Sequence, residues 1–117
     1  MSDDRAHVLD MLAAACAIRR FVSGRSQDEF LRDDILQSAV LHKFTILGAA
    51  CRRVSVAFRA EHPSVDWLGI TNFRNQIVHE YDDVNLDTVW KILETDLPVA
   101  IAALEPLAPE DPDAQEG

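Results

Sequence analysis

The stretch that decides the fold spans residues 67–81 and reads WLGITNFRNQIVHEY. Its apolar side chains recur at three- and four-residue spacing, which is typical of one buried helical face, as at Ile70, Phe73 and Ile77. An arginine, an asparagine, a histidine and a tyrosine stand in the same segment, where leucine and alanine would suffice for packing. We therefore predict a packed helix that also carries a site for chemistry.

Helical signals precede this stretch. Residues 3–4 can cap a first helix, whose apolar stripe stops at residues 23–24. Ser26 and Glu29 form a capping-box pattern, in which each side chain bonds the other residue's free backbone amide. We therefore expect a short second helix through residue 32.

The longest predicted helix begins at residues 33–34 and runs to Glu61. It should end at His62, because the residue before a proline is pushed out of helical geometry. Apolar residues widen its buried face on two sides, which indicates a central position in the fold. A patch of small residues at 48–50 would let another helix approach closely.

The helix that holds residues 67–81 should be capped by Ser64 and end near Tyr81. A turn follows, and Asn85 is a good cap for the next helix. Pro98 should break or kink that helix before the last turns. Strand-like alternation occurs nowhere in the sequence, so we predict an all-α fold, an antiparallel bundle of four main helices with short helices added.

Length and charge define the domain and limit its partners. The 117 residues fit one domain, which we place at residues 1–108, followed by an acidic, disordered tail at residues 109–117. The net charge of −9 argues against a broad nucleic-acid surface, because neutralising phosphates requires clustered lysine and arginine. A small local binding site for nucleic acid is still compatible with this net charge.

Metal and membrane sites are not indicated. Cys16 and Cys51 lie far apart in apolar stretches without zinc-ligand spacing, so two buried, reduced thiols are expected and no metal or cofactor is predicted. The start of the chain lacks the pattern of a signal peptide, and no apolar run approaches membrane-spanning length. A cytoplasmic protein is the expectation.

Arg74, Asn75 and His79 suit cleavage of RNA without a metal. On a helix Asn75 and His79 share a face, while Arg74 lies roughly 140° around from His79. A histidine can take the proton of a ribose 2′-hydroxyl or give one to the leaving oxygen, and an arginine can hold the phosphate. One histidine does not readily perform both proton transfers, so a symmetric dimer that supplies two copies is favoured.

The same residues have plainer interpretations. Arg74 can be a surface arginine, and His79 can simply close the C-terminal end of its helix. Tyr81 can be an amphipathic residue at the rim of the core with its hydroxyl in water.

Similarity over most of the chain favours the catalytic interpretation. The sequence resembles the HepT family of HEPN-domain toxins from about residue 6 to residue 107. The matching segments are residues 67–81 together with Phe30-Leu31, residues 46–50, His62-Pro63, Val84-Asn85, Val89-Trp90 and Asp96-Leu97-Pro98.

The resemblance implies a HEPN bundle that forms a homodimer with a cleft between its subunits. It implies a metal-independent endoribonuclease in which Arg74 and His79 take the Arg-x4-His catalytic positions. Asn75 takes the polar position beside the arginine.

The resemblance also implies a partner, an antitoxin that is a nucleotidyltransferase of the MntA type. In the Arg-x4-His-x-Tyr form of the motif the antitoxin transfers AMP to the tyrosine, here Tyr81. A bulky negative group beside a phosphate-binding cleft would block and repel RNA.

One position departs from the family pattern. The family commonly has an acidic residue in the middle of its Gly-Glu-Ala patch, where this chain has Ala49. This departure and the acidic charge support an alternative function, a non-catalytic HEPN module that binds and regulates a nucleotidyltransferase.

Overall fold

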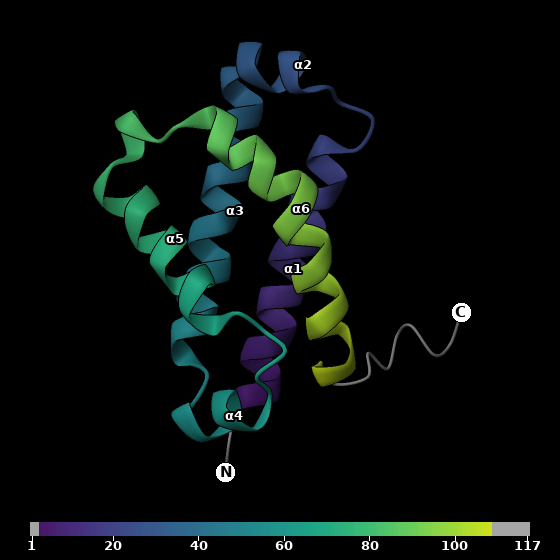
Figure 1. The fold of residues 1–117 in the computed structure, drawn as a ribbon, viewed down its shortest axis with the longest axis vertical. Helices are drawn as coiled ribbons and strands as arrows, with labels where there is room; N and C mark the ends of the chain where they lie inside the picture. Colours follow the sequence, from purple (N-terminus) through teal and green to yellow (C-terminus); the bar gives the residue numbers. More distant parts are fainter. Residues whose placement is uncertain (1–2, 109–117) are drawn as a thin grey trace.

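The computed structural model describes residues 3–108, and this part of the chain is helical with no strand. Figure 1 shows the arrangement of the helices. They are α1 Asp4–Val22, α2 Gln27–Arg32, α3 Asp34–Arg53, α4 Val56–Glu61, α5 Trp67–His79 and α6 Leu86–Leu104, with the 3-10 turns η1 Tyr81–Asp83 and η2 Glu105–Leu107. The prediction of an all-α fold is confirmed.

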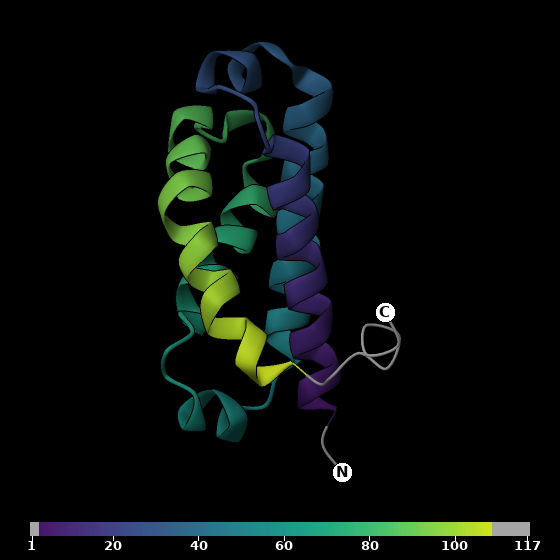
Figure 2. The ribbon, with the colours of Figure 1, turned by 90° about the vertical axis from the view of Figure 1, so that its right-hand side faces the viewer.

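Four main helices form an antiparallel bundle. Successive long helices α1, α3, α5 and α6 run in alternating directions, and the short helices α2 and α4 lie at opposite ends (Figures 1 and 2). Helix α3 packs against both α1 and α5, as its two apolar faces predicted, and α6 packs against α1. One core of buried side chains joins them, among them Met11, Phe44, Ile77 and Ile101.

Three helices begin where the sequence predicted. Ser26 and Glu29 form the complete capping box of α2, and hydrogen bonds from the Ser26 backbone and side chain hold the pKa of the Glu29 carboxyl below its usual value. Asp33 caps α3 and Asn85 caps α6. Asp3 occupies the cap position of α1 but makes no capping bond with its side chain.

The prediction of one helix from Asp34 to Glu61 is wrong. Helix α3 ends at Arg53, Val54 is extended, and Ser55 caps α4 through a bond from the Phe58 backbone amide. The Ser55 backbone amide and hydroxyl both donate to the Asp4 carboxylate, each over 2.7 Å. The chain breaks here because the Ser55 amide pairs with a carboxylate of α1 instead of continuing the helical ladder.

Two further boundaries differ from the predictions. Helix α5 is capped by Asp66 instead of Ser64 and ends at His79. Pro98 does not break α6, which continues through it from Leu86 to Leu104, and the kink named as the alternative to a break stays a prediction. A proline inside a helix costs about 3 kcal/mol, and burial of Leu97 and Ile101 on either side of it offsets this cost.

Two predictions concern the tail of the chain and its relation to a membrane. The acidic tail predicted at residues 109–117 lies outside the described residues, so the domain boundary at residue 108 stays a prediction. Among residues 3–108, no helix combines the length and the apolar character needed to cross a membrane.

Candidate functional site

Arg74 is held by close contact between two helices. Its stem packs directly over Gly48 of α3, where an added Cβ would collide with Cβ and Cγ of Arg74. The predicted patch of small residues is therefore where α5 approaches α3. The sequence indicated both residues but not their contact, because Gly48 and Arg74 lie 26 positions apart in the chain.

The Arg74 guanidinium is positioned by its neighbour. Its Nη1 atom donates to Oδ1 of Asn75 over 3.1 Å. Its Nε atom is buried and has no hydrogen-bond partner within residues 3–108. The guanidinium is thus oriented by one neutral acceptor, with hydrogen-bonding capacity left for an anion.

His79 and Tyr81 stand at the end of α5, where the chain turns toward α6. His79 is the last residue of the helix and is exposed, and its side chain has no hydrogen-bond partner in the described part of the chain. Tyr81 opens η1 with 47% of its surface exposed. The structure therefore links Arg74 to Asn75 and leaves His79 and Tyr81 accessible to solvent.

Two apolar side chains are exposed on the same side of α5 as Asn75. Leu68 is 71% exposed and Val78 is 46% exposed. At about 100° per residue both fall within about 60° of Asn75 around the helix. The polar residues thus belong to a partly apolar surface, the type of surface that is often covered by another polypeptide.

Metal ligands and thiols are two further groups to consider within residues 3–108. No group of three histidine, cysteine, aspartate or glutamate side chains within residues 3–108 could hold a metal ion. Burial raises the pKa of the Cys51 thiol, which accepts a hydrogen bond from Thr71. Cys16 is only half-buried, contrary to the prediction of two buried thiols, and both cysteines are unpaired.

Comparison with known proteins identifies the family. The family described as "Ribonuclease HepT-like" matches residues 11–107. The chain belongs to the HepT-like ribonuclease family. This confirms the resemblance drawn from the sequence, and the matched region contains the contact between Gly48 and Arg74 as well as His79 and Tyr81.

Individual relatives support this assignment. A protein of Methanocaldococcus jannaschii named "Putative RNase" is 30% identical over 103 residues, which cover 88% of this chain and 85% of the relative. A second protein of that name from the same organism is 29% identical, with 82% and 88% of the two chains covered. The "Probable ribonuclease HepT" of Thermococcus cleftensis is 28% identical, with 76% and 81% covered. No solved structure matches the chain significantly.

Proposed function

We propose that this HepT-like chain is a metal-independent endoribonuclease that acts as the toxin of a toxin–antitoxin pair in the cytoplasm. The observation that carries the proposal is Arg74, whose stem packs over Gly48 and whose guanidinium donates to Asn75, on the helix that ends at His79. Membership of a ribonuclease family supports this chemistry.

His79 and Arg74 have distinct roles in the proposed reaction. The imidazole of His79 takes the proton from a ribose 2′-hydroxyl, and the freed oxygen attacks the adjacent phosphorus. Arg74 holds the phosphate and stabilises its developing negative charge. The bond to the 5′-oxygen breaks, and the products carry a 2′,3′-cyclic phosphate and a 5′-hydroxyl.

The leaving 5′-oxygen needs a proton donor, and we propose the His79 of a second subunit. An isologous interface brings the same residue together from both subunits. The exposed Leu68 and Val78 beside Asn75 supply apolar surface for such a homodimer. RNA then binds in a cleft between the subunits, close to both copies of Arg74.

The catalytic assignment is tested with two matched histidine variants. Purified protein should cleave RNA in EDTA, and His79→Ala should lower the rate by at least about a hundredfold, the usual contribution of a general acid or base. His42→Ala removes another exposed histidine, from α3, and should leave the rate unchanged. Equal cleavage by wild type and His79→Ala would falsify the assignment.

We further propose that an MntA-like nucleotidyltransferase silences the toxin by modifying Tyr81. The phenol oxygen of Tyr81 attacks the α-phosphorus of ATP, pyrophosphate leaves, and the phenol proton passes to a base of the partner. The exposure of Tyr81 makes its hydroxyl accessible. The AMP group places negative charge two residues from His79, which would repel RNA phosphates.

The acceptor can be identified by mass spectrometry, because Tyr81 is the only tyrosine in the chain. Incubation with the partner and ATP should add one adenylate to the wild type and none to Tyr81→Phe. Since phenylalanine keeps the ring, this variant should still cleave RNA. An unchanged adenylate mass on Tyr81→Phe would place the acceptor on another residue.

The second candidate is a non-catalytic HEPN module that binds and regulates a nucleotidyltransferase. It is favoured by Ala49, a half-buried methyl group beside Gly48 where the family pattern has an acidic residue. A toxin should arrest growth when expressed alone, and Arg74→Ala should relieve the arrest. A harmless chain that co-purifies with the transferase would support the module.

A further inference from the structure

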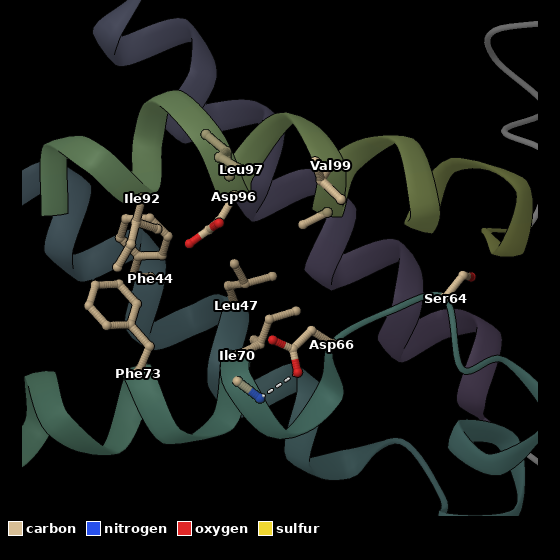
Figure 3. A pocket seen from close by; sticks show the side chains of 12 residues that line it. Phe44, Leu47, Ser64, Asp66, Ile70, Phe73, Ile92, Asp96, Leu97 and Val99 are labelled. Carbon is tan, nitrogen blue, oxygen red and sulfur yellow. Dashed lines mark hydrogen bonds between the residues drawn. The ribbon is translucent and has the colours of Figure 1, made fainter. Parts of the chain in front are cut away.

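A cavity of about 340 Å³ opens between α5 and α6 and is floored by α3 (Figure 3). Phe44 and Phe73 meet edge to face on its wall, with ring centroids 5.0 Å apart. Leu47, Ile70 and Ile92 extend the apolar lining. The volume lies within the range of about 300–1,000 Å³ that is usual for small-molecule sites.

This cavity is separate from the candidate catalytic residues. It lies on the side of α5 that carries Phe73. At about 100° per residue, Asn75 and His79 lie roughly 160° and 120° around the helix from Phe73. A ligand in the cavity would therefore not occupy the position proposed for RNA.

Two carboxylates from different helices line the apolar space. Asp66 at the start of α5 and Asp96 of α6 lie on facing sides of the cavity in Figure 3. Asp66 uses Oδ1 to accept from the Gly69 backbone amide over 3.0 Å. No lysine or arginine within residues 3–108 forms a salt bridge with either carboxylate.

Asp96 has the freer carboxylate of the two. Among the residues that the structure describes, its one polar partner is the Thr95 hydroxyl, at 3.4 Å. That hydroxyl has a single proton and lies closer to the Lys91 carbonyl oxygen, at 2.7 Å. Asp96 can therefore accept from a ligand without losing a strong bond within the protein.

We propose that this cavity binds a small amphiphilic cation, an aromatic ring or short alkyl chain that carries one amine or guanidinium group. The apolar body would pack on Phe44, Phe73 and Ile92, and the cationic group would donate to Asp96. Apolar walls with a few polar groups that fix orientation are the usual composition of a small-molecule site. A charge-assisted bond to Asp96 gives selectivity for cations.

The negative charge of Asp66 and Asp96 argues against two other occupants of the cavity, residues 109–117 and a second copy of the chain. The residues at 109–117 include four acidic side chains and no basic one, so the carboxylates of the cavity would repel them. An isologous contact centred on this cavity would bring Asp66 and Asp96 of two copies together, which is repulsive. A small cation carries no negative charge, so neither repulsion applies to it.

The test compares three ligands of similar shape and different charge. The ligands are 2-phenylethylamine, 2-phenylethanol and 3-phenylpropanoate, each titrated into the full-length protein. Binding is monitored by NMR through the backbone amide signals of Phe73, Ile92 and Asp96. The amine should bind about two- to fivefold more tightly than the alcohol, because Asp96 is exposed and an ion pair in contact with solvent adds little affinity. The carboxylate should not bind.

Variants on α6 assign the charge selectivity to one residue. Asp96→Asn should reduce the affinity for the amine about two- to fivefold, to that for the alcohol. Glu94→Gln removes an exposed carboxylate that does not line the cavity and should change nothing. The proposal would be overturned if the amine and the alcohol bound equally well, or if Asp96→Asn kept the wild-type affinity for the amine. Amine binding that occurs only after the protein is diluted to monomers would overturn it as well.

Discussion

At the scale of single residues, Gly48 determines where the candidate catalytic arginine lies. A glycine inside a helix usually costs stability, about 1 kcal/mol relative to alanine. Here the missing side chain lets α5 approach α3 at Arg74. The nearest atom is Cβ of Arg74, which no side-chain rotation can move away. Any residue larger than glycine would therefore push the two helices apart.

Gly48→Ala should consequently destabilise the protein although alanine favours helices. Overpacking typically costs about 1–3 kcal/mol, which outweighs the gain of about 1 kcal/mol in helix propensity. Urea denaturation should show a lower free energy of unfolding, and RNA cleavage should fall because Arg74 is displaced.

The control for this substitution is Ser38→Ala on the same helix. Ser38 is exposed, so the change tests helix propensity without a collision. The free energy of unfolding of Ser38→Ala should equal that of the wild type or be slightly higher. If Gly48→Ala were stabilising by the same measure, the close contact with Arg74 would be disproved.

At the scale of elements, the break between α3 and α4 depends on one buried carboxylate. Asp4 is 7% exposed and accepts two hydrogen bonds from Ser55 at the first turn of α4. Together these bonds fix α4 against the start of α1. The local sequence gives little sign of the break, because the acceptor lies 51 residues away along the chain.

Asp4→Asn should weaken this junction. An asparagine has one acceptor oxygen, so its amide group would face one of the two Ser55 donors. Losing a hydrogen bond to a charged group costs about 1.5–3 kcal/mol. The thermal midpoint should fall, and limited proteolysis should cut first between α3 and α5.

Asp3→Asn is the matched control for the loss of charge at the start of α1. The Asp3 side chain makes no capping bond, so this variant loses only the interaction with the helix dipole. The thermal midpoint of unfolding of Asp3→Asn should stay close to that of the wild type. Equal effects of the two substitutions would show that the bonds to Ser55 contribute nothing to stability.

At the scale of the whole molecule, the bundle presents the candidate site on an outer surface. Arg74 and Asn75 are partly exposed and His79 is exposed, with Leu68 and Val78 uncovered nearby. A single chain supplies one histidine to this surface, whereas the proposed reaction uses an acid and a base. The proposed homodimer completes the site.

Mixing wild type with an inactive variant tests whether the site is shared. A mixed dimer of wild type and His79→Ala holds one histidine, so it lacks the proposed acid–base pair and should not cleave RNA. Random pairing of equal amounts makes about half of the dimers mixed and leaves about a quarter fully wild type. Unfolding and refolding the two proteins together should therefore halve the activity per wild-type chain, with sedimentation confirming the dimer mass. Undiminished activity per wild-type chain would place each site within one subunit.

Local signals in the sequence determined the elements and the residue types of the site. The caps at Ser26 and Asn85 formed as predicted, because a capping side chain bonds amides two or three residues away, and α3 begins at the predicted residue. Apolar periodicity likewise determined the helices, and the resemblance from about residue 6 to residue 107 indicated the family.

Only the tertiary structure decided the contacts between distant segments. It placed Gly48 under Arg74, used Asp4 to end α3, and kept Pro98 within α6 because its neighbours are buried. It also formed the cavity between α5 and α6. Such features depend on how far apart two helices lie and at what angle they pack. Those quantities are set by the summed packing of many side chains, and no local sequence pattern records them.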